Sequence, residues 1–132
     1  YGLSVTSLQL ANAYNIIASG GVQHQVSFLK QEEALSSKRI ISPIMAKQLK
    51  AILQTPVENG GTATRAAISG YSVAGKTGTS KLHIKGGYSD KHYNSLFAGF
   101  VPANNPQFTA VVIINDPKGR DYYGGLVAAP VF

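Results

Sequence analysis

The chain has 132 residues, which is enough for one domain with a sizeable core but short for two. Apolar residues make up 44% of it and charged residues 14%, which excludes a disordered polyelectrolyte, and the absence of Cys excludes disulfides and Cys-based metal sites. Twelve Lys and Arg against six Asp and Glu give a net charge of +6, but these cations are scattered, which favours a solvated basic surface over a nucleic-acid site.

The first predicted helix has both a start and a stop signal. Thr6 and Gln9 have the spacing of a capping box, and apolar residues then recur at helical intervals. Two consecutive glycines, Gly20 and Gly21, supply the stop, so a helix is predicted over about 7–19. In the less regular segment that follows, 26–29 is predicted as a short strand.

A second helix is predicted to begin at Ser42 and Pro43, the residue types preferred at a helix cap and at the first helical position. Pro56 ends or kinks this helix, because proline in a helix interior removes a backbone hydrogen bond. Its apolar side is formed at helical spacing by Met45, Leu49, Ile52 and Leu53.

From about residue 69 the sequence changes to patterns typical of strands. Strands are predicted around 71–75, at 96–101 and at 108–115, with a Pro- and Asn-rich turn at 102–106. The polar, Gly-containing stretch 81–91 is predicted as a loop. Two helices followed by successive strands indicate an α+β fold in which one antiparallel sheet is flanked by helices.

The densest cluster of residues that could carry chemistry is 70–79. In letters, Gly70 to Thr77 fits the phosphate-binding pattern G-x-x-x-x-G-K-[ST]. That pattern requires a helix that begins near Lys76, whereas the residues before Lys76 are β-like and Gly78 opposes helix initiation. A nucleotide site is therefore the weaker interpretation.

The other interpretation places Lys76, Thr77, Gly78 and Thr79 at the end of a strand that lines a site. K-T-G is one of three signatures of the penicillin-recognising serine acyltransferases. In such a site the lysine supplies charge, the threonine hydroxyls bind a carboxylate, and the glycine leaves room for a substrate backbone. Because K-T-G also occurs by chance, an ordinary β-turn that contains a lysine is the alternative.

Beyond K-T-G, several other segments of the chain match one protein family, and they occur in the same order as in that family. Together they resemble the class B, septal penicillin-binding proteins, which are peptidoglycan D,D-transpeptidases of cell division. The resemblance covers nearly the whole chain and is weakest across 31–39. The segments that carry it are 1–11, 73–79, 94–103, the strand that ends at Asn115-Asp116-Pro117, 122–125 and 129–132.

This resemblance implies a fold like that of the serine β-lactamases and transpeptidases, and acyl transfer through an acyl-enzyme with no cofactor. A serine would attack the D-Ala-D-Ala bond of one peptidoglycan stem peptide, and the amine of a second stem would accept the acyl group. β-Lactam antibiotics would acylate the same serine. The resemblance also implies a membrane-anchored parent protein on the extracytoplasmic, periplasmic face of the inner membrane, with division-complex proteins as partners.

The resemblance assigns roles within the K-T-G strand. The backbone N–H of Thr79 is expected to be one oxyanion donor, the other being the N–H of the serine itself. The hydroxyls of Thr77 and Thr79 are expected to bind the terminal carboxylate of the stem peptide, and Lys76 adds positive charge.

Other residues have weaker assignments. Family members place aromatic residues near K-T-G, which points to Tyr93, Tyr122 and Tyr123 as a wall of the site, with ordinary half-buried tyrosines as the alternative. Lys81 either flanks the pocket or is solvated. The histidines lack the spacing of metal ligands, so no metal site is expected at His24, His83 or His92.

The family's two other signatures, S-x-x-K and S-x-N, are not found in usable positions. Ser27 and Lys30 match S-x-x-K in letters but follow a helix stop in a β-like segment, and S-x-N does not occur. The chain also begins at Tyr1 without a signal-like segment and ends inside an apolar run. Residues 1–132 are therefore expected to be the C-terminal portion of one transpeptidase domain, inactive without the remainder that carries the nucleophile.

Two other functions stay open from the sequence. One is a serine β-lactamase, which shares the K-T-G strand but hydrolyses the ester; the helix start at 6–11 and the segment 115–117 argue against it. The other is a non-enzymatic β-lactam sensor. For the K-T-G strand itself, 76–79 is predicted to lie at an inner edge of the sheet, facing a groove, and not at a helix N-terminus.

Overall fold

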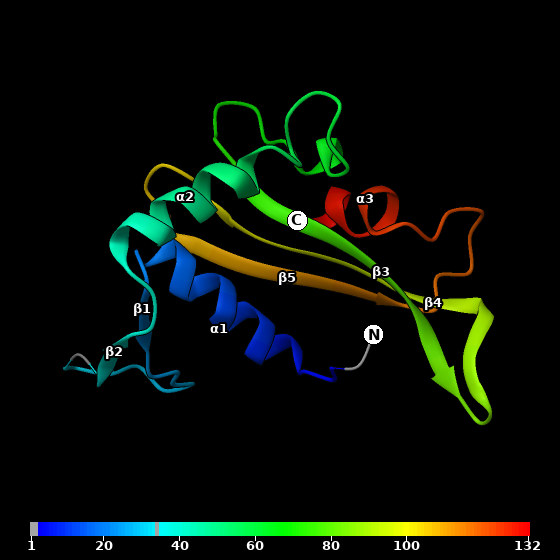
Figure 1. The fold of residues 1–132 in the computed structure, drawn as a ribbon, viewed down its shortest axis with the longest axis horizontal. Helices are drawn as coiled ribbons and strands as arrows, with labels where there is room; N and C mark the ends of the chain where they lie inside the picture. The colour runs from blue at the N-terminus through cyan, green and yellow to red at the C-terminus, as the bar shows by residue number, and fades with distance from the viewer. Residues whose placement is uncertain (1–2, 34) are drawn as a thin grey trace.

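The computed structural model describes residues 3–33 and 35–132. Three long strands run side by side across the molecule, and helix α1 lies along them (Figure 1). This mixture of helices and antiparallel strands confirms the predicted α+β class. In chain order the elements are α1 (Ser7–Ala18), β1 (Val22–His24), β2 (Ser37–Arg39), α2 (Pro43–Gln54), η1 (Thr64–Ala66), β3 (Ala74–Ile84), β4 (Gly87–Val101), β5 (Phe108–Asn115), α3 (Gly124–Val127) and η2 (Ala129–Val131).

The strands form two sheets rather than the single sheet predicted. β3, β4 and β5 form an antiparallel sheet in that order, so β3 and β5 are its edges within the described chain. β1 and β2 form a separate two-stranded sheet. They connect the end of α1 to the start of α2, where the Ile40 N–H donates to the Gly21 carbonyl at 2.8 Å. The short hairpin is therefore held beside the helices and not at an edge of the large sheet.

Each face of the large sheet carries its own hydrophobic core. Alternate residues of a strand point to opposite faces of the sheet, so in β4 the side chain of Phe97 lies in one core and that of Phe100 in the other. Both side chains are fully buried. On the Phe100 side, the residues that α1 and α2 pack against the sheet are Tyr14, Ile17, Ala18 and Leu53. On the Phe97 side, the cover comes from Ala63, Ala66, Ala128, Ala129 and Phe132.

Both predicted helices form with the predicted caps. Thr6 and Gln9 make the two hydrogen bonds of the capping box, at 2.8 and 3.1 Å. Ser42 Oγ accepts the backbone N–H of Met45 at 3.2 Å. The apolar side predicted for α2 is only partly buried, because Met45 is 50% and Ile52 61% exposed. No helix in the described part of the chain is long and apolar enough to cross a membrane.

Three local predictions are wrong. The strand predicted around 71–75 begins only at Ala74. Residues 26–29 form an exposed loop, and the strand lies at 22–24 instead. Residues 81–91 are a strand hairpin rather than a loop, and it projects beyond the helices (Figure 1). A strand with few apolar neighbours on either side has no reason to alternate apolar and polar residues, so the usual sequence signal of a strand is missing there.

Candidate active site

The K-T-G motif lies near the start of β3, not at the end of a strand as predicted, because β3 continues to Ile84. It lies at an edge of the three-stranded sheet and not at a helix N-terminus. The phosphate-loop interpretation is therefore wrong, because its lysine must stand at the start of a helix. The side chain of Lys76 is exposed, and its Nζ donates to the carbonyl oxygen and to Oγ1 of Thr77, both at 3.1 Å. A cation and a hydroxyl thus meet at the edge of the sheet.

The register of the ladder gives the direction of the backbone groups in β3. The Tyr93 carbonyl accepts the N–H of Asp116 at 2.8 Å, so Tyr93 directs its backbone groups toward β5. Ser95 lies two residues further along and does the same, because alternate residues of a strand direct their backbone groups to one edge. Its partner Thr79 is therefore not bonded to β4. The N–H groups of Thr79 and Thr77 face the open edge of β3.

The hydroxyls of Thr77 and Thr79 lie on the Phe97 side of the sheet. Thr77 Oγ1 donates to Thr62 Oγ1 at 3.1 Å, and Thr79 Oγ1 accepts the backbone N–H of Gly124 at 3.0 Å. Sequence reasoning missed both partners. Consecutive glycines at 124–125 are a usable signal for a close approach of two backbones, whereas no local pattern singles out Thr62.

Gly78 makes room for a side chain of the neighbouring strand. A Cβ at Gly78 would lie 2.9 Å from Cγ of Leu96, so Leu96 occupies that space. The packing of Leu96 is a sufficient structural reason for the glycine. The approach of a substrate backbone to Gly78 stays a prediction from the resemblance.

The three tyrosines named from the sequence form one stack. Tyr93 stacks on Tyr122 with ring centroids 4.1 Å apart and an interplanar angle of 15°, and Tyr122 stacks on Tyr123 at 4.5 Å and 29°. Tyr93 is two residues from Ser95 and so lies on the same face of the sheet as Thr79. Tyr123 is 56% exposed. The structure thus places an accessible aromatic surface on the Thr79 side of the sheet.

Lys81 lies further along β3 and forms an ion pair with Asp90 across the hairpin. The hydrogen bond from Lys81 is the main cause that lowers the pKa of Asp90 from its ordinary value. Lys81 also lines a cavity beside the hairpin, and a role at the edge of the site stays a prediction from the sequence.

Ser27 lies in an exposed loop and not at the start of a helix. Its Oγ donates to the Leu29 carbonyl at 2.8 Å and accepts a hydrogen bond from Gln31 at 2.8 Å. An S-x-x-K nucleophile depends on a helical turn that brings the lysine beside the serine. The geometry therefore agrees with the interpretation of Ser27 and Lys30 as a chance match.

The three histidines lie on different strands. His24 is in β1, His83 is in β3 and His92 is in β4. The described residues contain no group of three His, Cys, Asp or Glu that could hold a metal ion. His92 has a different partner, because its Nδ1 lies 2.8 Å from Oδ1 of Asp116.

The turn after β5 is held by charged contacts at Asp116. Lys118 pairs with Oδ2 of Asp116 while His92 contacts Oδ1. Hydrogen bonds from Lys118 and then from His92 lower the pKa of Asp116 from its ordinary value of 3.8. The folded protein therefore favours the carboxylate form of Asp116 more strongly than the unfolded chain does.

Asp116→Asn is expected to destabilise the full-length protein more at pH 7 than in acid. Because the folded-state pKa is lowered, the carboxylate stabilises the fold fully above its unfolded-state pKa, and this contribution is lost as the pH falls through the folded-state pKa. Urea unfolding from pH 7 down to the lowest pH at which both proteins fold measures the difference. Asp121→Asn, at an exposed carboxylate of the same loop, is the control. A difference that does not shrink in acid would contradict this account.

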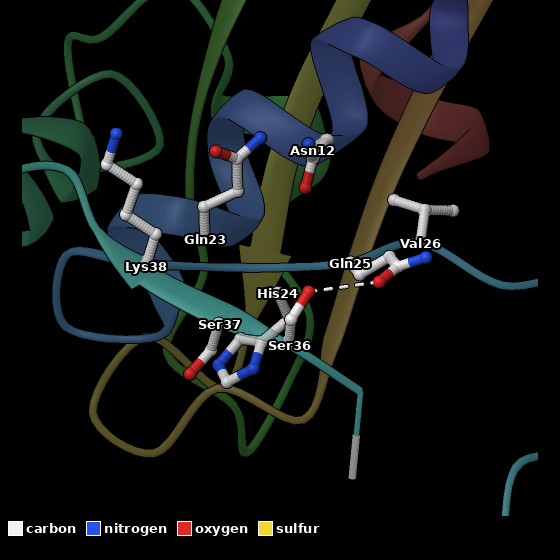
Figure 2. Close-up of a pocket in the computed structure, with 8 residues that line it drawn as sticks. All are labelled: Asn12, Gln23, His24, Gln25, Val26, Ser36, Ser37 and Lys38. Atoms are coloured by element: carbon white, nitrogen blue, oxygen red, sulfur yellow. Dashed lines mark hydrogen bonds between the residues drawn. The ribbon is translucent and has the colours of Figure 1, made fainter.

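Two of the cavities in the described part of the chain, both lined by residues outside the K-T-G motif, lie beside strands. One of about 500 Å³ lies between α1 and the β1–β2 hairpin, where Ser36 donates to Gln25 at 3.0 Å (Figure 2). The other, of about 460 Å³, lies between the chain before α1 and the β3–β4 hairpin. The groove predicted to face the K-T-G motif stays a prediction, and the open edge of β3 is the place where it would form.

An antiparallel sheet covered by helices, with K-T-G in its edge strand, is the arrangement expected of the penicillin-recognising serine acyltransferases. The family model described as the penicillin binding protein transpeptidase domain matches residues 1–132, and the chain belongs to this family. The comparisons of this chain with known proteins give no support to a β-lactamase, a β-lactam sensor or a nucleotide-binding module.

Relatives with curated names agree with this family. The chain is 41% identical over 132 residues to the probable peptidoglycan D,D-transpeptidase PenA of Neisseria meningitidis serogroup B, and covers 23% of that protein. It is 39% identical to the peptidoglycan D,D-transpeptidase FtsI of Escherichia coli, of which it covers 22%. The chain thus spans about a quarter of the length of these relatives.

A solved structure gives the same assignment for the fold. The apo transpeptidase domain of penicillin-binding protein 3 from Burkholderia pseudomallei matches with a TM-score of 0.91 and 36% sequence identity. The match covers 100% of this chain and 40% of that one. The likeness to that solved transpeptidase domain therefore extends over the whole of this chain.

Proposed function

We propose that residues 1–132 form the C-terminal, K-T-G-bearing portion of a peptidoglycan D,D-transpeptidase domain of the class B, cell-division type. The observation that carries the proposal is the placement of Lys76 to Thr79 at an open strand edge, with the Lys76 ammonium 3.1 Å from the Thr77 hydroxyl. Names such as FtsI among the relatives support the division type. The nucleophile motif S-x-x-K and the motif S-x-N belong to the remainder of the domain.

The proposed reaction is acyl transfer through an acyl-enzyme. The serine oxygen from the remainder of the domain bonds to the carbonyl carbon of the D-Ala-D-Ala peptide bond, the C–N bond breaks, and D-Ala leaves after its nitrogen takes a proton. The amine of a second stem then displaces the serine. The N–H of Thr79 points to the open edge, where it donates to the oxyanion; one such donor is worth about 2.7–4 kcal/mol in other enzymes.

The terminal carboxylate of the stem is proposed to bind at Thr77 and Thr79. Thr79 Oγ1 already accepts the Gly124 N–H, so its own proton is available for a carboxylate oxygen. The Thr77 hydroxyl has the Lys76 ammonium beside it, and that charge favours an anion at this place. In the complete domain the same ammonium is expected within hydrogen-bond reach of the serine of S-x-N.

The tyrosine stack is proposed to form a wall of the same site. Tyr93, Tyr122 and Tyr123 present an aromatic surface on the Thr79 side of the sheet, and Tyr123 at its end is 56% exposed. Such a surface suits the apolar parts of a stem peptide or of a β-lactam side chain. No cofactor takes part in this mechanism.

The remainder of the domain is also the proposed cover for several apolar surfaces. Ile44 on α2 is 73% exposed, and Phe108 at the start of the edge strand β5 is 72% exposed. An edge strand and a helix with exposed apolar residues are aggregation-prone unless another segment packs on them. The 132-residue piece by itself is therefore expected to be unstable and inactive.

The cellular setting follows from the substrate. Peptidoglycan lies outside the cytoplasmic membrane, so the proposed location is the cell envelope, at the periplasmic face of the inner membrane. The anchor is proposed to lie in a segment outside this chain. Division-complex proteins are the proposed macromolecular partners, and the scattered cations are proposed to be solvated, with no nucleic acid bound.

Labelled penicillin tests the proposal on the full-length protein. We expect one covalent label for each molecule, blocked by unlabelled β-lactam and abolished when the S-x-x-K serine is replaced by alanine. Release of the label within minutes would favour a β-lactamase, because a transpeptidase holds the stalled ester. A folded full-length protein that takes up no label would overturn the proposed function.

A further inference from the structure

Ser95 is a buried hydroxyl residue to which the proposed mechanism gives no role. It is 0% exposed in the middle of β4, and its partner across the ladder is Thr79. Residues directly opposite each other on neighbouring strands face the same side of a sheet. The side chains of Ser95 and Thr79 therefore lie next to each other, on the side of the sheet that α3 covers.

These two hydroxyls hold both ends of one short segment. Ser95 Oγ donates to the carbonyl oxygen of Tyr122. Thr79 Oγ1 accepts the N–H of Gly124 at 3.0 Å. The segment Tyr122–Gly124 is thus attached to β4 through its first residue and to β3 through its last.

The segment lies directly on the backbone of the sheet. A Cβ at Gly124 would lie 2.4 Å from the carbonyl oxygens of both Gly78 and Leu96. Gly124 is buried in this position. Because only Tyr123 separates the two attached residues, we expect a shift at Tyr122 to move Gly124 and to change the distance from the Gly124 N–H to Thr79.

The Gly124 contact determines what the Thr79 hydroxyl is able to do. A hydroxyl has one proton to donate and two lone pairs that accept. While one lone pair accepts the Gly124 N–H, the orientations open to the proton are restricted, and it is available to a ligand oxygen. Without the Gly124 contact, more orientations of the hydroxyl are accessible, and the Thr79 proton is less well oriented toward a ligand oxygen.

The hydrogen bond to the Tyr122 carbonyl also fixes the position of the tyrosine stack. The Tyr122 ring stacks on Tyr93 at 4.1 Å and on Tyr123 at 4.5 Å. Its backbone carbonyl is the atom that Ser95 holds. One hydrogen bond from Ser95 therefore acts on two proposed parts of the site, the Thr79 hydroxyl and the aromatic wall.

We propose that Ser95 is a positioning residue for acyl transfer, which acts through the segment Tyr122–Gly124 on the hydroxyl of Thr79. The inference rests on the proposed function, because Thr79 matters only if the chain belongs to an active transpeptidase site. Ser95 itself is fully buried, so its hydroxyl is not exposed at the surface of the site.

The test is the second-order rate of acylation of the full-length protein by labelled penicillin. Ser95→Ala is expected to lower this rate by about two- to tenfold, the equivalent of one neutral hydrogen bond. The matched control is Ser72→Ala, because the Ser72 hydroxyl also bridges to a distant backbone group, the N–H of Ala103 at 3.1 Å, but at the far end of the ladder. Ser72→Ala is expected to acylate at the wild-type rate.

A double-mutant cycle with Thr79→Val separates positioning from a general structural effect. If Ser95 acts through Thr79, Ser95→Ala lowers the rate by a smaller factor in the Thr79→Val background than in the wild type, and the effect that remains there is the part that acts through the tyrosine stack. Equal effects of Ser95→Ala in both backgrounds, or a Ser72→Ala loss as large as that of Ser95→Ala, would overturn the inference. A wild-type protein that is not acylated at all would overturn the proposed function instead.

Discussion

Lys76→Ala is expected to reduce the second-order rate of penicillin acylation of the full-length protein by about one to two orders of magnitude. The Lys76 ammonium contacts the Thr77 carbonyl and hydroxyl at 3.1 Å, and no other residue gives the K-T-G edge a charged hydrogen bond among the described residues. Losing a charged hydrogen bond is worth roughly 1.5–3 kcal/mol, which corresponds to about 10- to 150-fold in rate. The loss is larger if proton transfer also depends on the ammonium.

The fold is expected to survive this substitution. The Lys76 side chain is exposed, and its removal takes no apolar atoms from either core. Lys85→Ala, in the exposed turn of the same hairpin, is the control for a general loss of positive charge. Unchanged acylation by Lys76→Ala would remove this residue from the site. A parallel collapse of thermal stability would mark it as structural instead.

The parts of the fold that were predictable from the sequence depend on local interactions. The capping box of α1 joins Thr6 and Gln9, and the cap of α2 joins Ser42 and Met45, in each case only three residues apart. Such contacts leave a local pattern in the sequence. The K-T-G strand was also predictable, because β-like residues precede Lys76 and Gly78 excludes a helix there.

The parts that were not predictable depend on distant residues. Thr77 meets Thr62 at a separation of 15 residues, Ser95 meets Tyr122 at 27, and Thr79 meets Gly124 at 45. No sequence period connects such pairs, since the sheet register and the packing of α3 bring them together. The hairpin at 81–91 was missed for a related reason: none of its residues belongs to either hydrophobic core, so no apolar face produces an alternating pattern there.

The second large effect that we expect is a loss of stability on substitution of Gly124. Gly124→Ala should destabilise the full-length protein by about 1–3 kcal/mol, the usual range for an extra group forced into a packed site. The new Cβ would lie 2.4 Å from the carbonyl oxygens of Gly78 and Leu96. Both are backbone atoms of paired strands, so they cannot move aside as the end of a flexible side chain can. Either the ladder between β3 and β4 or the position of α3 must change.

The matched control for Gly124→Ala is Gly119→Ala, in the loop that precedes α3. The nearest atom to a Cβ at Gly119 is the Asp121 nitrogen, at 4.0 Å, so alanine there should be neutral or slightly stabilising. Chemical denaturation of both variants measures the difference. The acylation rate should fall with Gly124→Ala as well, because lifting α3 removes the N–H that Thr79 accepts. If Gly124→Ala is as stable as the wild type, α3 can move away from the sheet without a loss of stability. The close approach of α3 to the sheet would then not be what positions the Thr79 hydroxyl.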